Sequence, residues 1–233
     1  MRRVYIIGGI CAVIVLLVSV TWRLINSRSF QLFGEIVPRV ETSERVVALT
    51  FDDGPTPEAT DQVLSVLRER GVKATFFVIG GALEQHPELG QRIAQEGHEL
   101  GNHSYSHERM IFKTPSFIRQ EIERTDQLIR NTGYQGPIQF RPPYGKKFVL
   151  LPYYLSKLHR KSIMWDIEPD SDRSVAQHAD KIVAYVLSEA RPGSIILLHV
   201  MYKSGAPSLN AVSGIIDGLS QRGYKFKTVS ELL

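Results

Sequence analysis

The sequence contains very little cysteine. Its single cysteine, Cys11, cannot form an intramolecular disulfide bond, and one thiol cannot build a cysteine-rich zinc site or an iron–sulfur cluster. Cys11 lies inside an apolar N-terminal run, where a thiol behaves as a small hydrophobic side chain. The chain therefore has neither a disulfide framework nor a cysteine-based metal centre.

Acidic residues are missing from the first 30 positions, which contain Arg2, Arg3, Arg23 and Arg28. These four arginines account for the whole formal net charge of +4, so the 24 acidic residues of the remaining chain are balanced by equally many basic ones. Positive charge that flanks an apolar segment does not make the basic groove or stripe that nucleic acids require. We therefore predict no nucleic-acid partner.

Polar side chains are also scarce in Val4–Trp22, an uncharged run made mostly of Val, Ile and Leu. As a helix it would be about 28 Å long, close to the roughly 30 Å hydrocarbon core of a bilayer. We predict that residues 1–23 form an uncleaved signal anchor, because Val18-Ser19-Val20 is a poor cleavage site and Arg23 follows the run at once. This predicts a single-pass cell-membrane protein with an extracytoplasmic body, or a secreted protein if the segment is cleaved.

Internal repeats and low-complexity tracts are absent, and 43% hydrophobic with 22% charged residues is a globular composition. Residues 24–43 have no clear periodicity and are predicted to be a polar tether, followed by one domain over residues 44–233. In that domain, the predicted strands are 46–51, 74–79, one ending near 103, 138–141, 162–165, 194–199 and 225–229. The predicted helices are 57–70, 87–96, 115–131, 179–190 and 211–222. Such alternation predicts an α/β domain with a parallel sheet, either doubly wound or closed as a (β/α) barrel.

Polar motifs stand where the predicted strands end, and side chains from such ends converge on one site in either architecture. Taken singly, each motif has an ordinary structural explanation, such as a turn for paired aspartates or a core position for a histidine after an apolar strand. Two histidines four residues apart lie on one face of a helical turn and can share a metal ion. The motifs are Thr50-Phe51-Asp52-Asp53-Gly54-Pro55, His103-Ser104-Tyr105-Ser106-His107, Arg141-Pro142-Pro143-Tyr144-Gly145 and Leu197-Leu198-His199.

In this order, TFDDGP, HSYSH, RPPYG and LLH resemble the motifs of the polysaccharide deacetylase family (carbohydrate esterase family 4, the NodB-homology domain). The resemblance covers about residues 44–233. It implies a distorted barrel of seven or eight strands with a metal-dependent N- or O-deacetylase site. The roles it implies are metal ligands for Asp53, His103 and His107, general base for Asp52, orientation of that base for Arg141, a backbone N–H to the oxyanion for Tyr144, and general acid for His199.

The residue types suit this chemistry on physical grounds. One carboxylate and two imidazoles leave zinc with an open position for water, whose pKa then falls to about 7, so a neighbouring carboxylate can take its proton near neutrality. Arg141 would keep that carboxylate ionised. Because an amide leaves as an amine, a poor leaving group, a protonated His199 is needed to donate to it. We predict Zn²⁺, with Co²⁺, Ni²⁺ or Mn²⁺ able to use the same ligands.

One family feature is absent, namely an Asp-Trp pair that supports the acid histidine. The corresponding stretch reads Trp165-Asp166-Ile167-Glu168-Pro169-Asp170-Ser171-Asp172. We take Asp170 as the partner of His199, with Asp166, Glu168 and Asp172 as alternatives.

The combined prediction is a membrane-anchored carbohydrate N-deacetylase, a hydrolase of carbon–nitrogen bonds other than peptide bonds, acting on acetylated glycan. Peptidoglycan, chitin oligomers and poly-N-acetylglucosamine all stay open as substrates, and no protein partner can be deduced. The alternatives are an O-acetyl esterase and a catalytically silent glycan-binding protein. Specificity is predicted to come from three loops around the cleft, Glu108–Thr114, Phe148–Tyr154 and Met201–Pro207.

Overall fold

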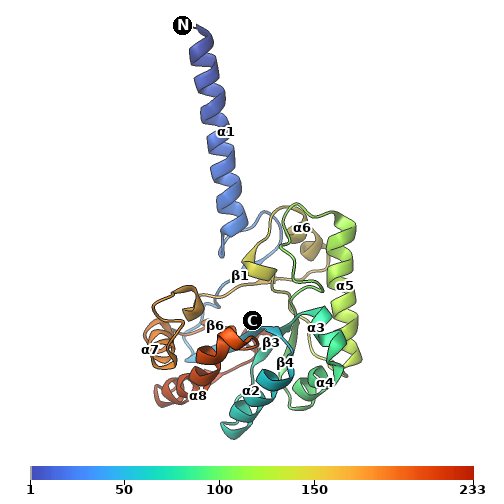
Figure 1. Cartoon of the computed structure of the whole chain (residues 1–233), viewed down its shortest axis with the longest axis vertical. Helices are drawn as coiled ribbons and strands as arrows, with labels where there is room; N and C mark the ends of the chain where they lie inside the picture. Colours follow the sequence, from blue (N-terminus) through green and yellow to red (C-terminus); the bar gives the residue numbers. More distant parts are fainter. Residues whose placement is uncertain (1) are drawn as a thin grey trace.

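A long N-terminal helix stands apart from the rest of the chain. The computed structural model describes residues 2–233, with side chains described from Tyr5 onward. Helix α1 (Arg2–Asn26) rises away from the other elements (Figure 1). Its stretch Tyr5–Asn26 is long and apolar enough to cross a membrane, and its most apolar part is not buried. The predicted apolar helix is therefore present and continues past Trp22 to Asn26.

The remaining elements alternate strands with helices, as the sequence predicts. The strands are β1 (Ile36–Val37), β2 (Val46–Gly54), β3 (Thr75–Val78), β4 (Glu99–Asn102), β5 (Ser162–Ile163), β6 (Ile195–Leu198) and β7 (Lys225–Phe226). The helices are α2 (Pro57–Glu69), α3 (Gly80–Gln85), α4 (Pro87–Gln95), α5 (Pro115–Asn131), α6 (Leu150–Lys157), α7 (Ala179–Glu189), α8 (Ala206–Gln221) and α9 (Val229–Leu232). Short 3₁₀ turns are η1 (Pro143–Gly145), η2 (Pro169–Ser171) and η3 (Lys203–Gly205).

The strands pair in parallel and close into a distorted barrel. β4, β3, β2 and β6 lie side by side in that order, β7 pairs with the start of β2, and β1 pairs with β5. Phe140 then bridges Asn102 of β4 to Ser162 of β5, and Ile167 bridges to Ile196 of β6, which completes the circuit. The predicted α/β class with parallel strands is thus confirmed.

Several predicted elements differ from the structure. The helix predicted over 211–222 begins at Ala206, and the strand predicted over 225–229 ends at Phe226 because α9 begins at Val229.

Two further differences have local reasons. The predicted strand over 138–141 is reduced to backbone bridges at Phe140. Pro137 precedes it and Pro142 follows it, and a proline has no N–H to donate to a neighbouring strand. The predicted loop Phe148–Tyr154 runs into helix α6, which the sequence analysis did not identify.

The predicted tether over residues 24–43 is packed against the body. Ile25 is buried, and β1 pairs with β5. The Val40 N–H donates to the Gly193 carbonyl at 3.0 Å. Because the pairing covers only two residues of β1, it leaves no alternating pattern long enough to recognise in the sequence.

Side chains alternate between the two faces of β2, and this alternation positions the site. Val47, Leu49 and Phe51 belong to the apolar cluster shared with helices α2, α7 and α8, whereas Ala48 belongs to a second cluster that includes residues of α9. Thr50 follows Ala48 in the same phase, and its hydroxyl donates to the Ile196 carbonyl at 2.8 Å. The period of two therefore directs Thr50 and Asp52, near the carboxyl end of β2, to the inner face.

Candidate active site

Two consecutive aspartates end strand β2 and both face the site. A regular strand would send neighbouring side chains to opposite faces. Here the register between β2 and β3 shifts between Asp52 and Gly54, and Asp53 has a φ of 73° in the left-handed region. This bulge turns Asp53 to the same side as Asp52.

The histidines of the second motif meet Asp53. One ligand atom each of Asp53, His103 and His107 lie within 4.8 Å of one another. Asp53 Oδ1 is 3.0 Å from His107 Nε2 and 3.5 Å from His103 Nε2. His103 Nδ1 lies 2.8 Å from the Arg141 carbonyl, so a proton on Nδ1 can be donated there while Nε2 keeps its lone pair.

The chemistry of these donors fits a divalent metal ion. Asp53 Oδ1 is buried and, within the described chain, makes no hydrogen bond with acceptable geometry, although two imidazole nitrogens face it. A buried carboxylate oxygen without a donor is costly unless a cation compensates it. Burial raises the pKa of Asp53, but close contact with His107 and the charges of His103 and His199 outweigh that effect, and the pKa lies below its usual value. The three residues therefore form a cluster suited to a divalent metal ion.

Asp52 is held by a fully buried arginine. Arg141 Nη1 donates to Asp52 Oδ1 at 2.7 Å and to Thr50 Oγ1 at 2.8 Å, and Nη2 donates to the Met164 carbonyl at 3.1 Å. The guanidinium carbon lies 4.0 Å above the centre of the Phe77 ring. The other carboxylate oxygen, Asp52 Oδ2, stays 3.5 Å from His103 Nε2 and faces the cluster.

His199 also borders the cluster and is held by Asp170. Its Nδ1 is 3.2 Å from Asp170 Oδ2, and its backbone N–H donates to the same oxygen at 2.8 Å. Its Nε2 is 3.9 Å from Asp53 Oδ2. Burial alone would lower the pKa of His199, but the hydrogen bond to Asp170 and the charges of Asp52 and Asp53 raise it to about 9. The Asp170 carboxylate therefore holds the His199 ring with its Nε2 facing Asp53.

The structure distinguishes the four acids that the sequence left as partners for His199. Asp166 accepts from the Ile195 N–H, Glu168 accepts from the Trp165 indole, and Asp172 accepts from the Ser174 N–H. Within residues 2–233, Asp170 is the one of these four that contacts His199. Burial raises the pKa of Asp170, but hydrogen bonds from His199 and Ser208 lower it below the usual value, so the carboxylate stays ionised.

The remaining predicted site residue, Tyr144, also lies at the cluster. Its ring centre is 4.6 Å from that of His107. Its backbone has a φ of 58°, inside the tight turn closed by the Gly145 N–H donating to the Pro142 carbonyl at 2.9 Å. The role predicted for its backbone N–H stays a prediction.

The pocket at this site has a volume of about 290 Å³, and part of its wall comes from residues that sequence reasoning missed. Arg28 donates to Glu168 at 2.6 Å, and its guanidinium carbon lies 4.7 Å above the Trp165 ring. A lone arginine in a segment without periodicity gives no indication of such a position. The pocket is lined by Arg28, Asp53, His103, His107, Tyr144, Trp165, Glu168, Ser171 and His199.

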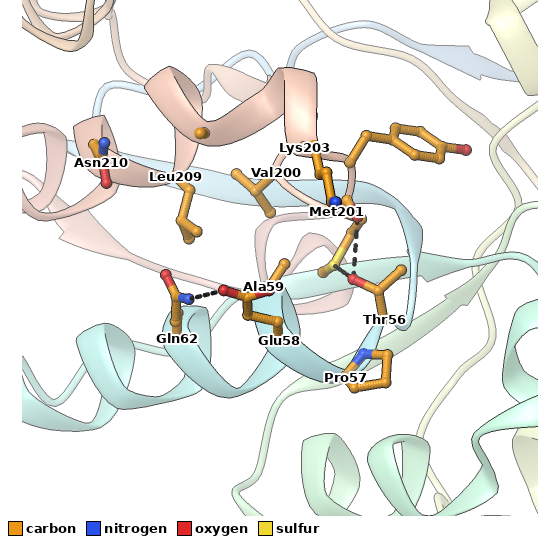
Figure 2. Close-up of a pocket in the computed structure, with 12 residues that line it drawn as sticks. Thr56, Pro57, Glu58, Ala59, Gln62, Val200, Met201, Lys203, Leu209 and Asn210 are labelled. Carbon is orange, nitrogen blue, oxygen red and sulfur yellow. Dashed lines mark hydrogen bonds between the residues drawn. The ribbon is translucent and has the colours of Figure 1, made fainter.

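A larger pocket of about 570 Å³ lies between the start of α2 and the segment after β6 (Figure 2). The Thr56 hydroxyl donates to the Met201 carbonyl at 3.1 Å across one end of it. The predicted loop Met201–Pro207 therefore contributes Met201, Tyr202, Lys203 and Ala206 to this neighbouring pocket.

The comparisons with known proteins agree with this geometry. The family model described as polysaccharide deacetylase matches residues 39–161. The chain belongs to the polysaccharide deacetylase family. Peptidoglycan-N-acetylmuramic acid deacetylase PdaC of Bacillus subtilis (strain 168) is 34% identical over 193 residues, which cover 83% of this chain and 40% of PdaC. This polysaccharide deacetylase chain thus spans less than half of that relative's length.

Solved structures share the polysaccharide deacetylase fold but differ in activity. The peptidoglycan N-acetylglucosamine deacetylase Bc1960 is 32% identical with a TM-score of 0.77, and the match covers 82% of this chain and 89% of that chain. BA3943 of Bacillus anthracis, a CE4 family pseudoenzyme, is 26% identical with a TM-score of 0.74, covering 83% of this chain and 67% of that chain. Membership of the family therefore does not by itself establish activity, which depends on the residues of the site.

Proposed function

We propose that this protein is a metal-dependent glycan deacetylase that hydrolyses N-acetyl groups and releases acetate. The observation that carries the proposal is the placement of two acid–base groups beside one ligand cluster, each held by its own partner. Asp52 is fixed by Arg141, and His199 is fixed by Asp170. A positioned base and a positioned acid are what hydrolysis of an amide requires.

The chain's own residues divide the reaction between them. A divalent ion held by Asp53, His103 and His107 would polarise the acetyl carbonyl and lower the pKa of water. Asp52 accepts the proton of the attacking water, and the hydrogen bond from Arg141 orients its carboxylate. His199 donates its proton to the departing nitrogen, and the Tyr144 N–H is proposed to stabilise the oxyanion.

We propose zinc as the ion. Two imidazoles and one carboxylate are ligands that zinc accepts, whereas calcium and magnesium prefer shells made only of oxygen. Cobalt, nickel and manganese can use the same ligands and are expected to support activity when supplied.

We propose N-acetylated cell-wall glycan as the substrate class. The names of the two deacetylases compared above assign N-acetylmuramic acid and N-acetylglucosamine units of peptidoglycan to those proteins. Chitin oligomers and poly-N-acetylglucosamine carry the same acetamido group and stay as alternatives. Helix α1 supports an anchored protein with its site outside the cytoplasm.

Acetate release by the full chain, purified with its helix in detergent and supplied with zinc, tests the proposal on N-acetylglucosamine oligomers and peptidoglycan. We expect turnover in the wild type and its loss in Asp52→Asn. Retained sugar binding without turnover on any acetylated glycan would contradict the proposal and favour a silent binding protein like the pseudoenzyme. Faster release from O-acetyl xylan than from all N-acetylated glycans would favour the esterase.

A further inference from the structure

The carboxyl end of α1 is fixed to the catalytic body. Ile25 is buried, and the next two residues are held by lysines, because the Lys146 ammonium donates to the Asn26 side chain and the Lys147 ammonium donates to the Ser27 carbonyl. The Lys147 side chain is only 1% exposed. The body is thus attached to the helix by contacts as well as by the chain.

The active-site pocket begins almost where the apolar stretch ends. That stretch ends at Asn26, and Arg28 already lines the pocket. Two residues of extended chain span about 7 Å. The headgroup region on each side of a bilayer is of similar depth, roughly 5–7 Å. If α1 spans the membrane as proposed above, one wall of the pocket is therefore at headgroup level.

Aromatic and aliphatic side chains lie near this junction, all exposed except the half-buried Phe148, and we name them the apolar rim. The Phe112 ring packs edge-on against Phe148 at 5.3 Å, and the Phe33 ring packs against Tyr153 at 5.4 Å. Phe112 is 73% exposed. The apolar rim consists of Phe30, Phe33, Phe112, Phe148, Leu150 and Tyr153.

The apolar rim is continuous with the attachment of α1. Lys147, which holds Ser27, precedes Phe148 directly, and it is bridged to Met110, which is close in sequence to Phe112. In Figure 1, α6 and one end of α5 lie at the level of the lower end of α1. A plane drawn across the end of α1 would therefore meet this face of the body.

The charges beside the apolar rim suit an anionic surface. Arg23, Arg109 and Lys157 are exposed around it, and the Lys157 ammonium lies 5.3 Å from the centre of the Tyr153 ring. Lys113 is balanced by Glu108 and Arg28 by Glu168. Exposed aromatic rings next to unbalanced cations are typical of protein surfaces at the membrane–water interface.

We propose that the apolar rim binds the headgroup layer of an anionic bilayer, so that the pocket opens at the membrane surface. The proposal rests on the proposed membrane anchor and deepens it, because the body itself would contact lipid. Two of the loops predicted to determine specificity, Glu108–Thr114 and Phe148–Tyr154, would then face lipid headgroups as well as glycan.

Depth measurement on the full chain in vesicles tests this. In a Cys11→Ser background, Phe112→Cys labelled with an environment-sensitive fluorophore is placed in phosphatidylglycerol–phosphatidylcholine vesicles that contain brominated lipids. We expect several-fold stronger quenching at position 112 than at Glu69→Cys, a control at the exposed end of α2. Equally weak quenching at both positions would overturn the proposal.

A flexible spacer between the apolar part of α1 and the body distinguishes two causes of quenching, binding of lipid by the apolar rim and simple proximity to the membrane anchor. Twenty flexible Gly-Ser residues inserted after Arg23 allow separations of roughly 25 Å while the residues from Ile25 onward stay in place. In the spacer variant we expect the label at position 112 to stay quenched. In the same variant labelled instead at Leu150→Cys, we expect quenching to be lost when Phe112→Ser and Phe148→Ser are added. Loss of quenching at position 112 on insertion of the spacer alone would overturn the proposal. Acetate release from soluble oligomers reports separately on the deacetylase function.

Discussion

Adjacent residues Asp52 and Asp53 have separate surroundings, and these surroundings support the separate roles proposed for them. Asp52 is bound to Arg141, whereas Asp53 faces His103 and His107. The sequence showed the pair but not the bulge that turns both side chains inward. That bulge depends on the register with β3, a contact between segments that are distant in sequence.

The two aspartates are expected to separate activity from metal binding. Asp52→Asn removes the proton acceptor and should lower turnover by about 100- to 10,000-fold while the metal content stays near that of the wild type. Asp53→Asn should lose both. Acetate assays and elemental analysis of the purified variants measure the two quantities. Metal loss in Asp52→Asn with full metal content in Asp53→Asn would mean that the two roles are reversed.

Asp170 is expected to act through His199. A comparison of amide and ester substrates, whose leaving groups need different degrees of protonation, tests this. Asp170→Asn weakens the support of the imidazolium and should lower turnover on N-acetyl substrates by up to roughly 100-fold. An ester needs less protonation of its leaving group, so the loss on O-acetyl substrates should be much smaller. Asp172→Asn, which alters an acid outside the site, is the matched control. Equal losses on amide and ester would argue that Asp170 only supports the local fold.

Long patterns fixed the bounds of an element, whereas short ones did not. Helix α5 was predicted with its observed bounds because Ile118, Ile122 and Ile129 recur on one buried face. The strand β5 was predicted two residues too long, and β1, which pairs with it over two residues, was not predicted because the sequence does not indicate its partner. The four motifs came together because strand ends converge in a parallel barrel, whereas Arg28 and the docking of residues 24–43 depend on contacts without a sequence pattern.

Buried His98, which precedes β4, is expected to make the free energy of unfolding fall in acid. The Ala74 N–H donates to Nδ1 of buried His98 at 3.3 Å, and burial together with the charge of Lys73 lowers the pKa of His98 to about 4. Between pH 6.5 and 4 the unfolded chain binds a proton there that the folded chain does not, so stability falls as the pH falls, by about 1.4 kcal/mol per unit.

Denaturant unfolding of the wild type and of His98→Gln at several pH values measures this effect. The variant should show a shallower loss of stability over that pH range. His86→Gln, at a less buried histidine, should keep the wild-type slope. An unchanged slope in His98→Gln would contradict the assignment.

The stability of the folded body is expected to depend on residues 24–29 at the end of α1 and just after it. Burial and the charge of Lys146 lower the pKa of Lys147 to about 8, and the Ser27 carbonyl accepts its hydrogen bond. A fragment that begins at residue 30 leaves this lysine buried without that acceptor, at a cost of about 1–3 kcal/mol. Its melting temperature should be roughly 2–12 °C below that of a fragment that begins at residue 24.

Calorimetry of the two fragments checks the difference. Lys147→Met should restore most of it in the shorter fragment, because it removes the buried charge. Equal melting temperatures without that substitution would show that the attachment of residues 24–29 contributes nothing to stability.

The barrel is closed at isolated bridges along residues 138–141 and 162–167. We expect local unfolding to begin in these two segments. β2 pairs with β3 and β6 over four register positions each, whereas isolated bridges, two at Phe140 and one at Ile167, join residues 138–141 and 162–167 to their neighbours. Backbone amides of residues 138–141 and 162–167 should therefore exchange with solvent deuterium sooner than those of β2. Arg141 and Trp165 belong to these residues, so a ligand bound in the site would slow exchange there first and couple occupancy of the site to the rigidity of this part of the barrel.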